Sequence, residues 1–412
     1  MDETGSLKRS AVDLIVNGGD GWIMHWSSLR RRELLKRSTA QISKKSRFKM
    51  YKTLQGLAVA AVLLSSTSVM AADRVVHVYN WSDYIDQSIL EDFTKETGIK
   101  VVYDVFDNNE LLETKLLAGA SGYDVVVPTG PFLARQIKAG VFQKLDKTKL
   151  PNIGNLWPDI MDRLAAYDPG NQYAINYMWG TTSIGYNVDK VKAALGDVPI
   201  DSWNIIFDPA NAKKLSSCGI NILDAPDETM AIALNYLGKN PNSKETADLK
   251  AGAEVFKKIR ASVRSFNSSA YINELATGDI CVTIGFSGDV LQAKARAEEA
   301  KNGVNVEYAI PKEGTYMWFD NLAIPADAKN VEEAHAFINY LMKPDVIAKA
   351  SNYVRYANGN LASQTLVDKD VRENASVYPP DAVLDKLFTI SPYDQKQQRV
   401  LTRLWTGIKA KN

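Results

Sequence analysis

The feature that most constrains the fold of this chain is a regular alternation of strand and helix patterns after residue 74. Runs rich in β-branched residues alternate with amphipathic stretches whose apolar residues recur at helical spacing. We expect strands at 75–81, 99–106 and 123–129, and helices at 85–98 and 111–119. The last strand, YDVVVPT, is nearly continuous in apolar residues, as in a buried parallel sheet. The alternation predicts a doubly wound α/β domain.

Cap residues mark the ends of these first helices. Gly98 closes the helix that begins at Ile85, and Asp83 could cap its start. Asp107 and Glu110 form a D-x-x-E capping pattern ahead of the second helix.

The rest of the chain continues the mixed pattern without repeats or a low-complexity linker. We expect extended segments at 172–187, 279–286 and 304–311, a turn at 287–289, and helices near 227–237, 246–261, 290–300, 331–342 and 344–352, with a last helix ending near 408. The 412 residues suffice for two globular domains. The expected architecture is therefore two α/β lobes with chain crossings between them.

The first 53 residues differ in charge from the remainder. They hold 12 Lys and Arg against 5 Asp and Glu, which leaves 37 basic and 43 acidic residues in the rest. Basic residues at 44–52 precede a short apolar run at 54–64 and the small residues of SSTSVMAAD, the pattern of a secretory signal cleaved after Ala71 or Ala72. A buried helix or an uncleaved anchor is the alternative. We expect 50–71 to be a signal peptide and 1–49 a basic extension, explained either by a true start near Met50 or by a long leader or tail.

The expected export bears on how the two cysteines and the net charge are interpreted. Two cysteines, Cys218 and Cys281, in an oxidising compartment favour one disulfide, with two separate buried thiols as the alternative. The mildly acidic body argues against a nucleic-acid partner and is compatible with a cationic ligand.

Aromatic and acidic side chains lie where several predicted strands end. The stretch GTYMWFDNLAIP sets Trp318 and Phe319 directly before Asp320. Aromatic faces attract ammonium groups, and a buried carboxylate needs a cation or hydrogen bonds. Because ligands gather at the carboxyl ends of strands in open α/β sheets, these residues predict an aromatic groove with carboxylates that suits a linear polyamine. The candidates are Trp81, Ser82, Asp83, Tyr84, Thr129, Asp227, Glu228, Phe286, Ser287, Asp289, Trp318, Phe319, Asp320 and Tyr356.

Each candidate alone also has a purely structural explanation. Trp81, Trp318 and Phe319 could be core residues. Carboxylates in a first helical turn are favoured by the helix dipole without any ligand, which would account for Asp227, Glu228 and Asp289.

Catalytic patterns are scarce in the exported part. It holds two distant histidines, His77 and His335, and no P-loop, H-E-x-x-H or G-x-S-x-G motif. Two cysteines and two distant histidines do not make a zinc site, so we expect no metal and no cofactor. A binding protein is the favoured class, and a secreted carboxylate-dependent hydrolase is the alternative from another class.

Several segments together resemble the periplasmic polyamine-binding proteins, the substrate-binding components of ABC importers for putrescine and spermidine. The segments are WSDYID, the stretch 101–129, INYMWGTTSIGYN, NILDAPDE, YINELATGDICVTIGFSGD, WFDNLAIPADAKN and YANGN. The resemblance runs from about Val75 to Trp405. It implies two α/β lobes of the type II periplasmic-binding-protein fold, hinged and closing on ligand in the cleft. The expected lobes are 74–178 with 302–363, and 179–301 with 364–412.

The resemblance also implies a set of ligand contacts. Carried over residue by residue, they fall on Trp81, Ser82, Asp83, Tyr84, Thr129, Glu228, Phe286, Asp289, Trp318, Asp320 and Tyr356, and the family's disulfide falls on Cys218 and Cys281. Putrescine binders of this kind usually have Trp in place of Phe286 and Phe in place of Trp318. Within the family, Trp at the second position goes with spermidine, so the resemblance implies a spermidine-preferring binder, with putrescine as the alternative.

The resemblance implies that the protein lies in the periplasm and that it binds its ligand without covalent chemistry. The closed form would dock on permease subunits in the inner membrane, and we expect a monomer. A sensor or adhesion component that uses the same fold without transport is a weaker alternative.

Overall fold

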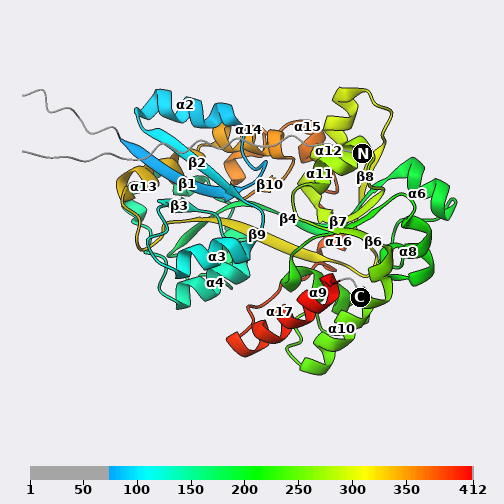
Figure 1. The fold of residues 1–412 in the computed structure, drawn as a ribbon. Coiled ribbons are helices and arrows are strands. Elements are labelled where there is room, and N and C mark those ends of the chain that lie inside the picture. Colours follow the sequence, from blue (N-terminus) through cyan, green and yellow to red (C-terminus); the bar gives the residue numbers. More distant parts are fainter. Residues whose placement is uncertain (1–73, 411–412) are drawn as a thin grey trace, which may run out of the picture. The chain divides into compact units, whose positions relative to one another are not determined.

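The computed structural model describes residues 74–410. The predicted basic extension (1–49) and signal peptide (50–71) lie outside the described residues. Within 74–410 the chain forms a ten-stranded mixed sheet covered by helices, with the strand order β2-β1-β3-β9-β4-β7-β5-β6, and with β8 and β10 also paired to β4 (Figure 1).

The first part of the chain forms a parallel ladder, as its pattern predicts. β1 (Val75–Trp81) pairs in parallel with β2 (Lys100–Phe106) and β3 (Val125–Val126). The crossover helices are α2 (Gln87–Thr97) and α3 (Asn109–Leu117). α2 ends as expected on Gly98, whose φ of 70° is the left-handed conformation that glycine adopts readily.

Both predicted helix starts are wrong by two residues, and the predicted cap residues by three and by one. Asp86, rather than Asp83, caps α2, and its side chain accepts a hydrogen bond from the Ser88 N–H. Asn108, rather than Asp107, caps α3 by accepting from the Leu111 N–H. In each case another Asx residue stands in the extended conformation directly before the first helical turn, which capping requires.

The third predicted strand is also shorter than its apolar run. Only Val125 and Val126 pair as a strand, because Pro128 lacks a backbone donor and the chain then turns into α4 (Gly130–Lys138). Thr129 thereby becomes the N-cap residue of α4.

Two long antiparallel strands form the centre of the sheet. The stretch expected as extended segments is one strand, β4 (Ala174–Asn187), and it pairs with β9 (Tyr316–Ala323) over most of its length. The register shifts between Asn176 and Met178, and Met178 then lies opposite Asp320. β8 (Val306–Ala309) and β10 (Ala357–Asn358) also pair with β4, so the sheet is mixed rather than wholly parallel.

The far side of the central pair carries a second parallel ladder. β7 (Val282–Phe286) pairs with β4 and with β5 (Ile220–Ile222), and β5 pairs with β6 (Val263–Phe266). A disulfide joins Cys218 and Cys281 directly before β5 and β7. The predicted turn at 287–289 is instead the first turn of α12 (Ser287–Ala300), which begins directly after β7 ends at Phe286.

The remaining helices pack over both faces of the sheet. They are α5 (Pro158–Leu164), α6 (Val188–Leu195), α7 (Asn204–Phe207), α8 (Pro209–Leu215), α9 (Pro226–Tyr236), α10 (Thr246–Ile259), α11 (Tyr271–Thr277), α13 (Val331–Leu341), α14 (Pro344–Val354), α15 (Lys369–Arg372), α16 (Asp381–Leu384) and α17 (Gln395–Lys409), with short 3-10 turns. None of the helices in the described part combines the length and the apolar character needed to cross a membrane.

The β4–β9 pair divides the molecule into two halves. We call β1–β3 with α2, α3, α4 and α13 the first half, and β5–β7 with α8 to α12 and α17 the second half (Figure 1). β4 runs without interruption through the predicted lobe boundary between 178 and 179, and the exact lobe boundaries stay predictions.

Candidate functional site

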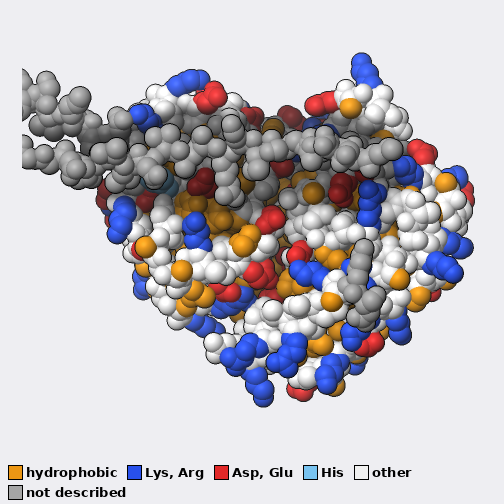
Figure 2. Space-filling model, in the orientation of Figure 1, with side chains coloured by type: hydrophobic (Ala, Val, Ile, Leu, Met, Phe, Trp, Pro, Cys, Tyr) orange, Lys and Arg blue, Asp and Glu red, His pale blue; other side chains and the backbone are white. Residues whose placement is uncertain are grey.

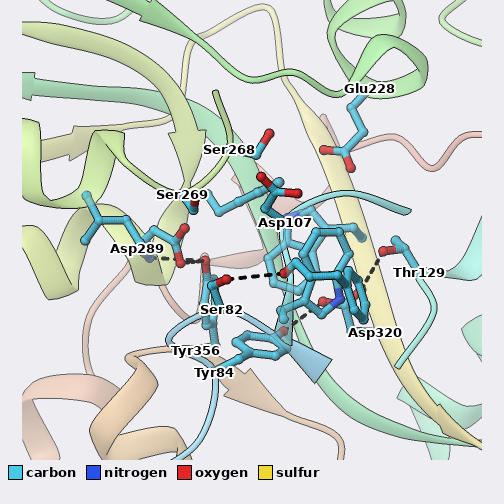
Figure 3. Close-up of a pocket in the computed structure, with 15 residues that line it drawn as sticks. Ser82, Tyr84, Asp107, Thr129, Glu228, Ser268, Ser269, Asp289, Asp320 and Tyr356 are labelled. Atoms are coloured by element: carbon cyan, nitrogen blue, oxygen red, sulfur yellow. Dashed lines mark hydrogen bonds between the residues drawn. The ribbon is translucent and has the colours of Figure 1, made fainter. Parts of the chain in front are cut away.

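A cavity lies between the two halves, where β1 ends and where α9 and α12 begin (Figure 3). Together with the open space at its mouth, it has a volume of about 460 Å³. The residues that line it are Trp81, Ser82, Tyr84, Phe106, Asp107, Thr129, Glu228, Ser268, Ser269, Ile272, Phe286, Asp289, Trp318, Asp320 and Tyr356. Every predicted ligand contact except Asp83 is therefore brought to one place.

Asp83 lies outside this lining. Its carboxylate is 41% exposed and pairs with the Arg296 guanidinium at 3.0 Å. Its φ of 54° directs the chain from β1 towards α2. Of the other strand-end candidates, Ser287 and Phe319 do not line the cavity, and Asp227 lines a neighbouring one.

Asp320 lies in the cavity wall on β9. Its two carboxylate oxygens accept hydrogen bonds from the Tyr84 hydroxyl at 2.9 Å and the Thr129 hydroxyl at 2.7 Å. The side chain is buried, and this burial raises the pKa of Asp320 to about 7, although the two hydrogen bonds oppose the rise. The position of Thr129 directly before α4, bridged to Asp320 on the central strand β9, brings these groups together.

Asp289 faces Asp320 across the cavity, from the first turn of α12 (Figure 3). Its carboxylate accepts hydrogen bonds from the Tyr271 hydroxyl at 2.8 Å and the Tyr356 hydroxyl at 2.7 Å. Burial raises the pKa of Asp289 to about 6. Burial also raises the pKa of Tyr271 and Tyr356 well above the ordinary phenol value, so both stay protonated and act as donors.

Glu228 supplies a third buried carboxylate from the first turn of α9. It accepts a hydrogen bond from the Thr182 hydroxyl on β4 at 2.9 Å. Burial raises the pKa of Glu228 to about 8, with smaller contributions from the negative charges of Asp320 and Asp227. The first-turn positions of Glu228 and Asp289 are those that the helix dipole favours, but both side chains also face the cavity.

Aromatic rings form the walls between these carboxylates. The Trp318 ring meets the Tyr356 ring edge-on at 5.1 Å and the Phe286 ring at 5.9 Å, and the Trp81 ring lies 6.4 Å from that of Phe286. Gly180 on β4 makes room for the indole, because a Cβ there would come within 2.7 Å of the Trp318 ring.

Five lining residues were missed by the sequence analysis. Phe106 and Asp107 stand directly at the end of the second predicted strand, so the strand-end rule that located Trp81 could have located them as well. Ser268, Ser269 and Ile272 follow β6, a four-residue strand that has too few residues to leave a periodic signal.

The chemistry of this lining favours an organic cation. Three carboxylates receive hydrogen bonds from hydroxyl groups, which stabilise their ionised forms, and aromatic faces lie between them. The described residues that line the cavity include no histidine and no cysteine. Within residues 74–410 no group of three or more His, Cys, Asp or Glu side chains is arranged to hold a metal ion.

Two curated relatives and one solved structure are similar to the chain over most of its length. The chain is 55% identical over 362 residues to the putrescine-binding periplasmic protein PotF of Escherichia coli K12, a match that covers 87% of this chain and 98% of that protein. It is 34% identical to the spermidine/putrescine-binding periplasmic protein of the same organism, over 78% of this chain and 88% of that protein. The crystal structure of a spermidine/putrescine ABC transporter substrate-binding protein, PotD from Streptococcus pneumoniae, matches with a TM-score of 0.66 and 28% identity, over 82% of this chain and 98% of that one.

These likenesses confirm the predicted two-lobe fold of the periplasmic-binding-protein type. The family model described as bacterial extracellular solute-binding protein matches residues 88–378. This family comprises solute-binding proteins rather than enzymes, so the alternative of a carboxylate-dependent hydrolase is wrong. The chain belongs to the family of bacterial extracellular solute-binding proteins.

Proposed function

We propose that the chain is a periplasmic binding protein that captures a polyamine and delivers it to the permease of an ABC importer. The observation that carries the proposal is the pair of buried carboxylates, Asp289 and Asp320, on opposite sides of an aromatic cavity. Among the described residues neither forms an ion pair with a side chain, and each is held by two hydroxyl donors. Burying an ionised carboxylate is unfavourable unless a cation compensates it, and a ligand ammonium is such a cation.

A linear diamine matches the order of groups along the cavity. One ammonium group would lie at Asp320 and the other at Asp289, with Trp318 and Tyr356 against the methylene chain. Each contact of an ammonium group with a ring face would add about 0.5–2 kcal/mol, depending on how much water is excluded.

The relatives favour putrescine over spermidine as the preferred amine. The relative named for putrescine alone is considerably more similar to this chain than the one named for spermidine and putrescine. The arrangement of Phe286 and Trp318, by contrast, favours spermidine. We propose putrescine as the preferred amine because similarity over the whole chain is greater to the relative named for putrescine alone. The effect of Trp318 on the preference is a separate prediction.

The transport role rests on the two-half construction. A ligand that contacts both halves stabilises the arrangement in which they are close, and so shifts an existing equilibrium between open and closed forms. Trp81, at the end of β1 in the first half, and Asp289, in the first turn of α12 in the second half, both line the cavity. A permease that recognises the closed shape would thereby accept loaded protein.

Calorimetric titration tests the proposal. The purified protein would be unfolded and refolded to remove bound amine, and then titrated separately with putrescine and spermidine. Micromolar or tighter binding of putrescine, with weaker binding of spermidine, is expected. Tighter binding of spermidine would keep the polyamine class and reverse the preference. The absence of heat and of a thermal shift with both amines would overturn the proposal.

A further inference from the structure

A second, smaller chamber adjoins the cavity. Together with the open space at its mouth, it has a volume of about 290 Å³. It shares Trp81, Asp107, Glu228, Ser268 and Phe286 with the cavity lining. We call it the distal chamber. Its further lining includes the carboxylates of Glu110 on α3 and Asp227 on α9. On the face seen in Figure 2, acidic side chains gather in a hollow between the region of α3 and α4 and the region of α9.

One arginine, Arg135, is bound to the Asp227 carboxylate from behind the chamber lining, to which Arg135 itself does not belong. The guanidinium of Arg135, on α4, forms two hydrogen bonds with Glu113, the longer at 2.7 Å, and lies 3.4 Å from the Asp227 carboxylate. It also donates to the Gln398 side chain on α17 at 3.3 Å, and Gln398 donates in turn to Asp227 at 3.0 Å. The side chains of Arg135 and Asp227 are 16% and 4% exposed, so water screens this contact poorly.

The proposed function gives this contact a consequence. A triamine that spans Asp320 and Asp289 carries a third ammonium group, and the distal chamber is the adjoining space lined with acids. The Asp227 carboxylate, however, already has a cation partner. Burial and the nearby negative charge of Asp227 also raise the pKa of Glu110, which lowers the negative charge available to a third ammonium group.

We propose that Arg135 is a specificity-determining residue, a cation bound to the lining residue Asp227 of the distal chamber that disfavours a third ammonium group there and so favours diamines over triamines. The inference rests on the proposed polyamine function. Its physical basis is that like charges repel strongly where water is largely excluded, while a diamine held at Asp320 and Asp289 does not need the chamber. Arg135 is a positioning residue that acts on the longer ligand through Asp227, the lining carboxylate that it pairs with.

A purely structural role makes a different prediction. Arg135 belongs to the first half, and Asp227 and Gln398 belong to the second half, so the contact also bridges the halves. If bridging were its whole contribution, removing it would weaken the binding of putrescine and spermidine by the same factor. The ratio of the two affinities therefore distinguishes specificity from bridging.

The test titrates putrescine and spermidine separately into Arg135→Met and the unaltered protein. Arg163→Met is the matched control, because Arg163 is exposed on α5 and forms no ion pair within residues 74–410, while the change in net charge is the same. We expect Arg135→Met to raise the ratio of spermidine to putrescine affinity at least tenfold, and Arg163→Met to leave it unchanged.

A second pair of variants keeps the test decisive if Arg135→Met does not fold. Asp227→Asn removes the opposite charge, and we expect it to lower the same ratio. The double variant Arg135→Met with Asp227→Asn restores the net charge of the chamber, and its ratio should return towards that of the unaltered protein.

The outcomes separate this inference from the proposed function. If the unaltered protein binds neither amine, the proposed function and this inference both fail. If it binds them and the ratio stays constant in Arg135→Met and Asp227→Asn, or if both affinities fall equally, only the role of Arg135 in specificity is overturned.

Discussion

At the scale of single residues, the site consists of carboxylates whose partners are hydroxyl groups rather than basic side chains. Tyr84 and Thr129 hold Asp320, while Tyr271 and Tyr356 hold Asp289. Hydroxyl donors fix the position of a carboxylate without neutralising it. The charge thus stays available to a cationic ligand, at the expense of the stability of the protein without ligand.

Replacing Asp320 by Asn should remove one ammonium anchor while keeping the side-chain shape. We expect putrescine affinity to fall at least about thirtyfold, since losing one member of a buried charge pair costs about 2–5 kcal/mol. Calorimetric titration measures the change. Asp162→Asn, an exposed change on α5, is the control and should have no effect. Equal affinities for both variants would refute the anchor role of Asp320.

Replacing Trp318 by Phe should shift preference further towards putrescine. The indole fills one wall of the cavity, and its N–H is buried without a hydrogen-bond partner in the described structure, so the change removes volume without breaking a hydrogen bond. The ratio of spermidine to putrescine affinity, measured by titration, should fall relative to Trp157→Phe, which alters a ring away from the cavity. A constant ratio would show that the position of the indole does not set ligand length.

At the scale of elements, the site depends on where strands end and helices begin. β1 and β7 were predicted from the sequence, and so was the clustering of Trp81 and Phe286, at the ends of these strands, with Asp320. The exclusion of Asp83 was not predictable, because its direction depends on a left-handed residue and on the partner Arg296, which lies 213 positions away in sequence. Ser268 was missed for the related reason that β6 is short and paired only to β5.

The first turn of α12 should tolerate no side chain at Gly288. A Cβ there would approach the Tyr356 ring to 2.5 Å, and Tyr356 donates to Asp289 one residue further along the chain. We expect Gly288→Ala to destabilise the protein by about 1–3 kcal/mol and to weaken putrescine binding, as measured by denaturant unfolding and titration. The control is Gly407→Ala on α17, where a Cβ meets nothing within 4 Å. That change should stabilise the helix by about 0.5–1 kcal/mol. The same loss of binding in both variants would contradict the role of Tyr356.

At the scale of the whole molecule, the two halves share one sheet and enclose three carboxylates whose pKa values are raised by burial. The α/β fold class was predictable from the alternation of strand and helix patterns. The antiparallel pairing of β4 with β9 at the centre of the sheet was not. A segment rich in Tyr, Ile and Thr such as β4 indicates an extended conformation but not the direction or identity of its neighbours, which are fixed only when distant strands meet.

Putrescine affinity should decrease as the pH falls below about 7. Burial raises the pKa of Asp320 to about 7 and that of Asp289 to about 6, and a dication binds best when both are ionised. Binding near pH 6.5 should therefore release protons, which titrations in buffers of different ionisation enthalpy would measure. Asp320→Asn should lack the decrease near pH 7, and a flat pH profile for the unaltered protein would exclude both carboxylates as anchors.

The same raised pKa values make the stability of the protein without ligand depend on pH in the opposite direction from putrescine affinity. A carboxyl group whose pKa is higher in the folded than in the unfolded chain binds its proton more tightly when folded. Its contribution to the free energy of unfolding therefore increases as the pH falls from about 8 towards about 5. Thermal unfolding across this range measures the trend.

The irregular step in β4 between Asn176 and Met178 lies directly beside the pairing of Met178 with Asp320. A strand bends most easily at such a step, so opening and closing would turn the halves about this part of the central pair. A carboxylate beside the hinge moves little during closure. Asp289 follows β7 in the second half, further from the hinge, and therefore moves further. Asp320 would then keep its position in the open and the closed form. One ammonium group of the amine would bind to it first, and closure of the second half would bring Asp289 to the other ammonium group.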